Sequence, residues 1–314
     1  MDNQHVAKKL RILLNGKKAG QEDVRQAIDK AREHGLVDVR VTWEGGDIAR
    51  LVKEAVSEQV ERLVVAGGDG SVNEMVNALM AIDKASRPAW GIMPLGTAND
   101  FATACEIPAD LFEALRLAQA GDAYPVDCIR ANEHYFMNVA SGGFGAQVTV
   151  NTPPALKNFL GGGAYTLSGV VQALKFSPFA GTVTFPDGTT QSDSVIVAAV
   201  CNGSQAGGGQ ILAADAKIND GLMRLMALSE FPLDQLNTVV EELQKGEDGK
   251  YVHKHHLSSV TWQTDKGMPI NLDGEPLHYG NNIVFEVKHL AVNLVLPPQC
   301  PLLVKAAGPI DGSI

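Results

Sequence analysis

The sequence predicts two domains: an N-terminal doubly wound α/β domain over residues 1–125, and a C-terminal antiparallel β-sandwich domain with inserted helices over residues 126–289. Up to Pro125, short apolar strands alternate with amphipathic helices, which is typical of a parallel sheet covered on both faces. After Pro125, short strands follow one another with turns between them, which is typical of a sandwich or barrel. With 314 residues, 45% of them hydrophobic, the chain can fill two packed cores.

In the α/β half, the spacing of the apolar residues predicts each element. Strands are expected over residues 10–14, 37–43, 62–66 and 89–95. The helix after the first strand is expected to stop at Gly35, and Asp47 is expected to cap the helix after the second strand. The helix after the third strand carries its apolar residues at helical spacing. Because ligands bind at the carboxyl ends of strands in such sheets, the polar loops at those ends are candidate sites.

In the β-rich half, strands are expected over residues 126–130, 135–140, 181–185, 193–201, 222–228, 258–264, 270–272, 282–287 and 292–296. Two helices interrupt them, over Phe159 to Phe176 and over Leu233 to Leu243. The tail over residues 305–314 is expected to be flexible.

Charge and cysteine content exclude several classes of protein. Lys and Arg number 26 against 36 Asp and Glu, and the resulting net charge of −10 disfavours binding to nucleic acid and permanent attachment to an anionic membrane. The four cysteines have no metal-binding or CxxC spacing and are expected to be free thiols in a reducing cytoplasm. The N-terminal residues lack a signal pattern, and the longest apolar run, Val195 to Cys201, is too short to span a bilayer. A cytoplasmic protein is therefore expected.

The chain is organised around the glycine-rich stretch Ala66 to Glu74, where a strand turns into a helix. Glycines let backbone N–H groups approach a ligand closely, and a helix N-terminus favours phosphate. Asp69 would repel phosphates unless a cation lies between them, so it implies Mg²⁺ or a hydroxyl partner. The alternative is that Asp69 and Ser71 only cap the helix.

A second loop, Pro94 to Phe101, repeats this design with a glycine, a hydroxyl, an amide and a carboxylate. Two such loops on neighbouring parallel strands would place Asp69 and Asp100 near one another. Phosphoryl transfer needs this combination of backbone donors, hydroxyls, a metal and a base. The chain has no GxxxxGK[ST] motif and no GxGxxG motif, so neither a P-loop enzyme nor a dehydrogenase is indicated.

These two loops, Gly67 to Glu74 and Gly96 to Phe101, resemble the diacylglycerol kinase catalytic family, which is similar to the sphingosine kinases and more remotely to NAD kinase and phosphofructokinase. The resemblance continues in family order over nearly the whole chain, at 138–145, 207–209, 218–222 and 271–276. Ser71 stands where the family commonly has threonine, and the hydroxyl is kept. The resemblance implies an NAD kinase-like, Rossmann-like N-terminal fold to which the final strand, over residues 290–300, returns.

The resemblance also implies a nucleotide site lined by Thr42, Gly68, Asp69, Gly70, Ser71, Val72, Asn73, Glu74 and Thr97. It implies that Asp69 and Asp100 hold the catalytic Mg²⁺ and that Glu275 is the general base that accepts a proton from the acceptor hydroxyl. Two alternatives stay open: Thr42 is an ordinary strand threonine, and residues 273–276 form a hairpin turn with solvated charges.

A second cation, Mg²⁺ or Ca²⁺, is implied at the Asp220 carboxylate and the backbone carbonyls of Lys217 and Leu222, and the alternative there is a structural turn. Three histidines resemble a metal cluster, and His253 and His255 would share one face of a strand. Since no cysteine or carboxylate partner is found at ligand spacing, these histidines are interpreted as surface residues.

The sequence as a whole therefore predicts an ATP-dependent lipid kinase, with a diacylglycerol- or phosphatidylglycerol-class acceptor. A kinase with a soluble acceptor, similar to NAD kinase, is one alternative. A nucleotide sensor without catalysis is another, although it would not need the base Glu275.

Contact with the membrane is expected to be transient, peripheral and apolar, with Phe159 to Phe176 as the candidate segment. The apolar face of that segment could instead pack on the second domain.

Overall fold

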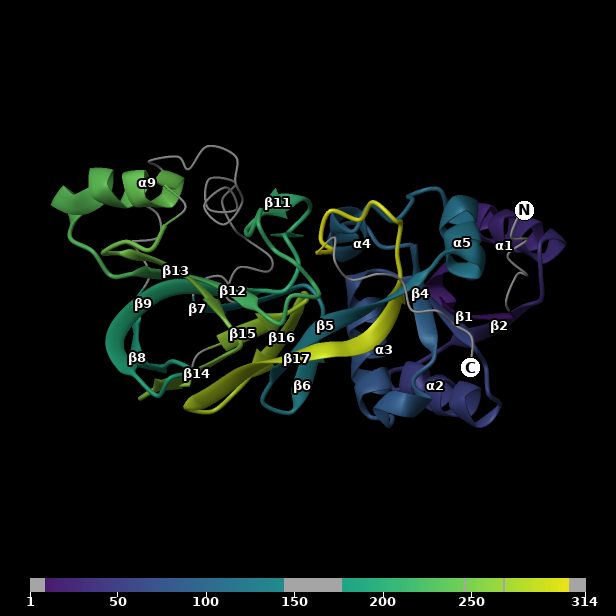
Figure 1. The fold of residues 1–314 in the computed structure, drawn as a ribbon, viewed down its shortest axis with the longest axis horizontal. Coiled ribbons are helices and arrows are strands. Elements are labelled where there is room, and N and C mark those ends of the chain that lie inside the picture. The colour runs from purple at the N-terminus through teal and green to yellow at the C-terminus, as the bar shows by residue number, and fades with distance from the viewer. Residues whose placement is uncertain (1–8, 144–176, 246, 268, 305–314) are drawn as a thin grey trace. The chain divides into compact units, whose positions relative to one another are not determined.

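The computed structural model describes residues 9–143, 177–245, 247–267 and 269–304, which fall into two compact units (Figure 1). Unit 1 contains the chain up to Cys128, Ile218–Asp220 and the part from His289 onward. Unit 2 contains Ile129–Lys217 and Gly221–Lys288. The helix expected over Phe159 to Phe176 and the tail over residues 305–314 lie outside the described residues.

Unit 1 is built on a parallel sheet in the order β17-β4-β3-β1-β2. The predicted alternation of strands and helices is confirmed. Its elements are β1 (Leu10–Asn15), η1 (Gly16–Lys18), α1 (Glu22–Glu33), β2 (Val37–Thr42), α2 (Asp47–Ser57), β3 (Arg62–Gly67), α3 (Asp69–Met80), η2 (Lys84–Ser86), β4 (Ala89–Pro94), α4 (Asp100–Ala104), α5 (Leu111–Ala120) and β5 (Ala123–Ala131), and β5 continues into unit 2.

Helices cover both faces of this sheet, with α1 and α5 on one side and α2 and α3 on the other (Figure 1). Val24 and Ile28 of α1 and Leu115 of α5 are buried against Ile12 of β1 and Val64 of β3. Burial of the apolar side chains on both faces is what makes these parallel strands almost continuously apolar in sequence. The sheet edge at the carboxyl ends of the strands is left for the polar loops.

The strand β17 (Asn282–Val295) supplies residues to both units. Two separate strands were expected here, over 282–287 and 292–296, and this expectation is wrong. The carboxylate of Asp127, which is 0% exposed, accepts the backbone N–H of Leu290 at 2.6 Å and contacts Nδ1 of His289 at 2.8 Å. Leu290 has a left-handed φ of 48°. The buried carboxylate therefore holds the irregular point at which the strand would otherwise break.

Unit 2 is antiparallel β structure, as predicted. In it β9 pairs with β7, β8 and β12, while β14 pairs with β8 and β17. Its elements are β6 (His134–Phe136), β7 (Val139–Gly143), β8 (Phe179–Thr184), β9 (Thr190–Cys201), β10 (Gln205–Ala206), β11 (Gln210–Ile211), β12 (Met223–Ser229), η3 (Leu233–Gln235), α9 (Leu236–Lys245), β13 (Val252–Leu257), β14 (Ser259–Thr264), β15 (Pro269–Leu272) and β16 (Glu275–His278).

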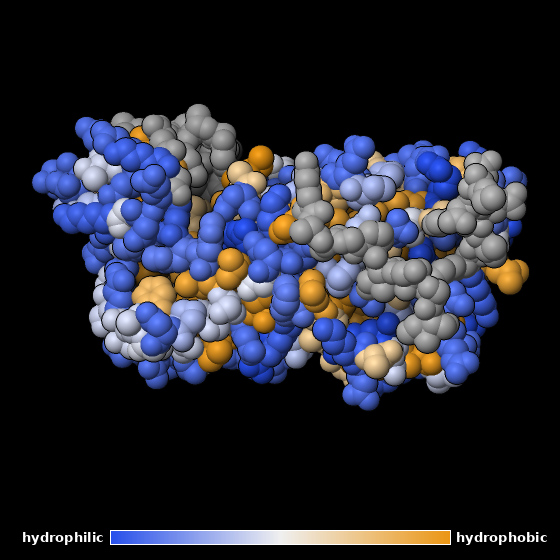
Figure 2. All heavy atoms as spheres, in the orientation of Figure 1, coloured by the Kyte–Doolittle hydropathy of each residue, from blue (hydrophilic) through white to orange (hydrophobic). Residues whose placement is uncertain are grey.

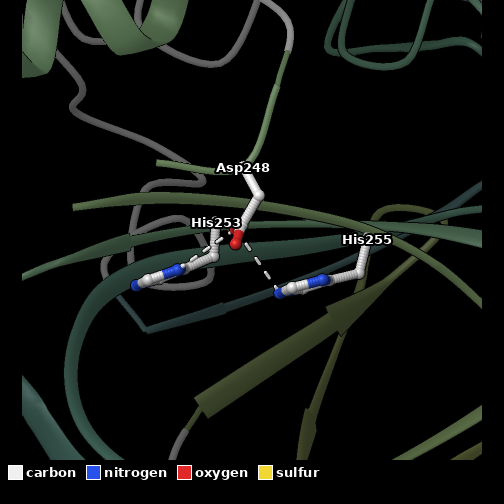
Figure 3. A group of neighbouring side chains, drawn as sticks. All are labelled: Asp248, His253 and His255. Atoms are coloured by element: carbon white, nitrogen blue, oxygen red, sulfur yellow. Dashed lines mark hydrogen bonds and ion pairs between the residues drawn. The ribbon is translucent and has the colours of Figure 1, made fainter. Parts of the chain in front are cut away.

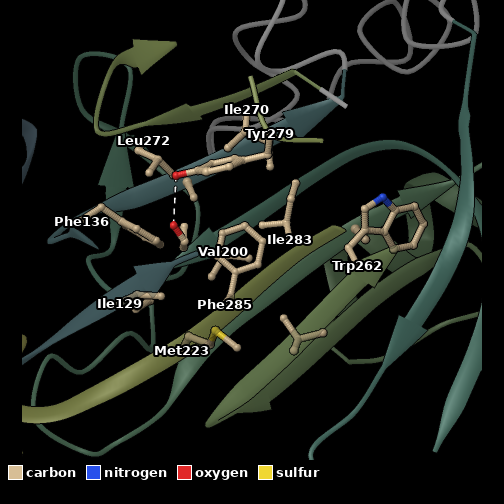
Figure 4. Packing of buried hydrophobic residues seen from close by; sticks show 14 of the residues in the cluster. Ile129, Phe136, Val200, Met223, Trp262, Ile270, Leu272, Tyr279, Ile283 and Phe285 are labelled. Carbon is tan, nitrogen blue, oxygen red and sulfur yellow. Dashed lines mark hydrogen bonds between the residues drawn. The ribbon is translucent and has the colours of Figure 1, made fainter. Parts of the chain in front are cut away.

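Aliphatic and aromatic side chains together fill the core between these strands (Figure 4). Phe136 and Phe285 meet edge to face, with ring centroids 6.3 Å apart. The hydroxyl of Tyr279 donates to the carbonyl of Ala131 at 3.0 Å, so the polar end of this buried ring is satisfied. Burial raises the pKa of the Tyr279 phenol. The hydroxyl therefore stays protonated and keeps this donor over the physiological range.

The helix α9 confirms the expectation of a helix over Leu233 to Leu243, with a 3₁₀ turn as its first part. Val239 and Leu243 are buried against Phe231 and Val252, while the visible side of α9 is hydrophilic (Figure 2). The helix is thus amphipathic and packs one face on the sheet.

Two local expectations are wrong. The strand expected over residues 135–140 is divided into β6 and β7, because the N–H groups of Met137 and Asn138 donate to the carboxylate of Asp273 at 2.9 and 3.0 Å. Asp47 does not cap its helix, since the capping residue is Gly46. The Asp47 carboxylate instead accepts the N–H groups of Trp43 and Glu44 in the preceding loop, and the first of these bonds is the largest cause of its pKa falling to about 2.

Candidate functional site

The glycine-rich loop after β3 leads directly into α3, as predicted, and the expected nucleotide residues lie in its first turns. Gly68 is the N-cap, and Asp69 is the first helical residue. The Asp69 carboxylate accepts the backbone N–H of Phe101 at 3.4 Å, in the first turn of α4, directly after the loop that follows β4. Asp69 therefore links two loops rather than capping its own helix.

Of the other residues expected along this helix, Val72 is buried in the core, so only its backbone could face a nucleotide. Glu74 is exposed, and Gly70, Ser71 and Asn73 are half-buried. The first turn of α3 thus combines backbone donors with a partly accessible hydroxyl. Such a helix N-terminus favours an anion.

The loop after β4 is closed by Asn99, whose amide both donates to and accepts from the backbone of Gly96. The two bonds are 2.8 and 2.9 Å long, and Asn99 itself has a left-handed φ of 51°. Thr97 stands exposed on this loop, and Asp100, only 5% exposed, begins α4. The loop thus presents one exposed hydroxyl and one buried carboxylate.

The two loops touch through their glycines. A Cβ added at Gly68 would lie 2.9 Å from the Cα of Gly96, and a Cβ added at Gly96 would lie 2.6 Å from the Cα of Gly68. Real Cβ atoms do not approach other carbon atoms so closely, so both positions require glycine for this approach. The neighbouring parallel strands β3 and β4 bring the loops together, and the two glycines allow them to meet.

Asp69 and Asp100 are close enough to interact electrostatically, as the sequence predicted. Burial raises the pKa of Asp69, and the negative charge of Asp100 raises it further. Two carboxylates in a partly buried site repel each other unless a cation lies between them. Oxygen ligands at such a place suit Mg²⁺, so the residues present fit this metal.

Thr42 is the last residue of β2 and pairs with Asn15 in the parallel register with β1. The Asn15 side chain accepts the N–H of Lys17, so Asn15 caps the single turn η1. Thr42 therefore lies at the carboxyl-end edge of the sheet. The next residue, Trp43, is 85% exposed, and the sequence analysis did not name it as a candidate site residue. The sequence signal that could have marked Trp43 as a candidate is its position, directly after a strand and before a Glu-Gly-Gly loop.

Glu275 lies in unit 2, at the start of β16. The two residues before it, Asp273 and Gly274, have φ of 49° and 97° and connect β15 to β16 as a two-residue hairpin turn. Asp273 is half-buried, and its carboxylate accepts N–H groups from Met137, Asn138 and Val139. Glu275 is exposed, and within the described residues no hydrogen bond to its carboxylate is found. The turn thus fixes Asp273 and leaves Glu275 accessible.

Lys217, Asp220 and Leu222 lie in one connecting segment before β12. Asp220 is half-buried, and Gly221 after it has a φ of 77°. The guanidinium of Arg224 donates to the Leu222 carbonyl at 3.0 Å, which uses one lone pair of that oxygen. The proposed ligands are all oxygen atoms, which Mg²⁺ and Ca²⁺ prefer.

The conclusion that the histidines have no carboxylate partner is wrong. Asp248 lies 3.3 Å from His253 and 3.6 Å from His255, and Asp193 lies 3.4 Å from His253. The side chains of His253 and His255 are half-buried rather than on the open surface. Asp193 is distant in sequence, so spacing alone could not reveal it.

Comparison with known proteins identifies two matching family models. Residues 9–131 match the diacylglycerol kinase catalytic domain, and residues 138–295 match the YegS C-terminal NAD kinase beta sandwich-like domain. In the described part of the chain, every helix is too short or too polar to cross a membrane.

Similar proteins cover almost the whole chain. A Shewanella frigidimarina protein named "Probable lipid kinase YegS-like" is 47% identical over 95% of this chain and 96% of its own length. A Yersinia pestis protein of the same name is 42% identical over 93% and 98%. The crystal structure of a Bacillus anthracis diacylglycerol kinase is 23% identical, with a TM-score of 0.71 over 94% of this chain and 98% of that one, which shows a shared fold.

The contact between the two loops makes a prediction about stability. We expect Gly68→Ala to destabilise the fold by roughly 1–3 kcal/mol, because the new methyl group must push the two loops apart. Gly20→Ala is the control, since a Cβ there would meet no described atom within 4 Å, and its effect should stay within about 0.5 kcal/mol. Denaturant unfolding measures both. Equal effects of the two substitutions would contradict the close approach.

Proposed function

The chain belongs to the family of YegS-like lipid kinases with a diacylglycerol kinase catalytic domain, and from this we propose that it transfers the γ-phosphate of ATP to the free hydroxyl of a lipid. The observation that carries the proposal is the meeting of two glycine loops at the carboxyl ends of β3 and β4, with Asp69 and Asp100 close together. Charge neutralisation and positioning of phosphates are what phosphoryl transfer requires of a protein.

In this proposal the phosphates of ATP bind at the N-terminus of α3, close to the backbone of Gly68, Asp69 and Gly70 and to the hydroxyls of Ser71 and Thr97. Thr42 contacts the nucleoside at the end of β2, and the exposed ring of Trp43 offers a surface on which the base can stack.

We propose that Asp69 and Asp100 hold a Mg²⁺ ion. When bound, this ion would neutralise phosphate charge as transfer proceeds. The raised pKa of Asp69 supports the assignment, because a buried carboxylate beside a second one is stabilised by a cation. The cation proposed at Asp220, Mg²⁺ or Ca²⁺, is a separate ion with a structural role.

Glu275 acts as the general base in this proposal. It accepts the proton of the lipid hydroxyl as the hydroxyl oxygen forms a bond to the γ-phosphorus and the bond to ADP breaks. The exposure of the Glu275 carboxylate supports this role. The hydrogen bonds from the N–H groups of Asn138 and Val139 to Asp273 hold the turn that precedes Glu275 in place. We propose a diacylglycerol- or phosphatidylglycerol-class acceptor, reached by transient contact of a cytoplasmic protein with the membrane surface.

The test is a transfer assay with radiolabelled ATP and vesicles that contain diacylglycerol or phosphatidylglycerol, with NAD as a soluble acceptor in a parallel reaction. Label is expected in the lipid. Glu275→Gln should lower turnover by about 10²–10⁴-fold, the usual cost of losing a general base. ATP binding, followed through the fluorescence of Trp43, should persist.

Glu133→Gln is the matched control, because Glu133 is also an exposed glutamate next to a hairpin turn, here the one between β5 and β6. Its turnover should equal that of the unaltered protein. Label in NAD alone would refute the lipid acceptor, and normal turnover of Glu275→Gln would refute the base.

Asp69→Asn is expected to lower turnover while keeping or raising the stability of the fold at pH 7. Because the folded protein raises the pKa of Asp69, the folded state holds this proton more tightly than the unfolded chain. The stability that comes with the proton is complete below the unfolded pKa and is lost as pH rises through the folded pKa. At pH 7 the ionised group therefore costs stability, and asparagine removes that cost while keeping an acceptor for the Phe101 N–H.

The melting temperature of Asp69→Asn without metal should therefore equal or exceed that of the unaltered protein at pH 7, and the difference in favour of the variant should grow between pH 4 and pH 7. Turnover should drop by about 10²-fold or more, the effect of removing one group that stabilises transition-state charge. An unchanged rate and Mg²⁺ dependence would refute the metal role of Asp69.

Asp220→Ala is expected to reduce turnover, because the second cation would lose its only side-chain ligand in the proposed set. In crystals soaked with Mn²⁺, an anomalous peak should appear beside Asp220 in the unaltered protein and be absent from the variant. Asp187→Ala, at an exposed turn between β8 and β9, is the control. Crystals of the unaltered protein without a peak at Asp220 would refute this site.

A further inference from the structure

Outside the proposed kinase site, three side chains of unit 2 converge in a way that the kinase reaction does not use. Asp248 precedes β13, and its carboxylate points between the rings of His253 and His255 (Figure 3). One ligand atom of each residue lies within 4.8 Å of the other two. Both histidines are on β13, two residues apart, so they project from the same face of this strand.

The distances fit a nitrogen-rich metal site. The Asp248 Oδ1 atom lies 3.3 Å from Nδ1 of His253 and 3.6 Å from Nε2 of His255. In a tetrahedral zinc site with bonds of about 2.0–2.1 Å, neighbouring ligand atoms are about 3.4 Å apart. One ring nitrogen of each histidine lies within 4.8 Å of the other and of the Asp248 carboxylate, so the three ligand atoms face the same space.

A second contact supports the site independently. The other ring nitrogen of His253, Nε2, lies 3.4 Å from the carboxylate of Asp193. Ser229 donates to that same carboxylate. A carboxylate on the remote nitrogen of a histidine is the arrangement that orients metal-bound histidines and fixes their tautomer.

The surrounding backbone holds Asp248 in place before any metal binds. The N–H of Lys254 donates to Asp248 Oδ1 at 3.2 Å. The carboxylate of Glu242 accepts the N–H groups of Lys250, Tyr251 and Val252, which fixes the segment between α9 and β13. The Asp248 side chain is 51% exposed, so an ion can reach the site from solvent.

We propose that Asp248, His253 and His255 bind a divalent transition metal of the Zn²⁺ type, with Asp193 positioning His253. Two imidazoles and one carboxylate favour such ions over Mg²⁺ and Ca²⁺, which prefer oxygen. Three protein ligands leave one coordination position for water. The bound ion would join the segment after α9 to β13, a strand whose sheet partner is β12, and would thereby stabilise this part of unit 2.

The test is a Zn²⁺ titration of the metal-free, full-length protein against a competing chelator dye, with Mg²⁺ in excess to occupy oxygen sites. One Zn²⁺ per chain is expected, together with a rise in melting temperature. His255→Ala should weaken binding at least about 10-fold, and Asp193→Asn about 10–100-fold, as changes behind a metal ligand do.

The matched control is His256→Ala, which removes the next histidine on the same strand. His256 pairs with Asp215 at 2.8 Å and belongs to the other face of β13, so its loss should leave Zn²⁺ affinity unchanged. Melting temperatures without metal show that each variant is folded. In Zn²⁺-soaked crystals, an anomalous peak should lie within about 2.0–2.2 Å of the three ligand atoms.

The proposal fails if no Zn²⁺ binds, if His255→Ala and His256→Ala weaken binding equally, or if the peak lies elsewhere. All variants keep the four buried cysteines, so binding to thiols would be the same in each and would not imitate the expected pattern.

Discussion

The contact between Gly68 and Gly96 is the constraint on which the proposed kinase site depends. Parallel pairing of β3 with β4 brings the ends of these strands together, but only residues without a Cβ allow their loops to touch. As a result, the N–H of Phe101 reaches Asp69, and the two carboxylates come within electrostatic range. The two glycines thus bring the two carboxylates together, in addition to letting a phosphate approach the backbone closely.

This geometry carries a cost in the free protein. Burial and the neighbouring Asp100 raise the pKa of Asp69, so keeping the Asp69 carboxylate ionised at neutral pH costs free energy. Such tension is common where a site must attract a cation, because groups that a ligand relieves contribute to its binding. The cluster of Asp248, His253 and His255 differs from the Asp69 site, because the Asp248 carboxylate faces histidines and a backbone donor rather than another acid.

Local sequence patterns predicted the fold class, the polar loops at the carboxyl ends of the parallel strands and the proximity of Asp69 to Asp100. They failed where a distant side chain decides the local structure. The carboxylate of Asp273 interrupts the strand expected over residues 135–140, and Asp127 holds together the strand around Leu290. The position of Asp193 beside His253 depends on the pairing of β9 with β12 and of β12 with β13. Hydrophobic periodicity carries no information about such contacts, and the roles of the site residues stay predictions.

The path of β17 has a consequence for how the protein is made. Unit 1 receives the strand β17 only after unit 2 has been synthesised, since His289 and Leu290, which contact Asp127, follow unit 2 in the sequence. A nascent chain leaving the ribosome would therefore expose the unpaired edge of β4 and an unsatisfied carboxylate until β17 has been made. Domains generally fold as units in order of synthesis. Here the α/β unit begins before unit 2 and is completed after it, so a ribosome that stops before β17 would release a chain whose α/β sheet is incomplete.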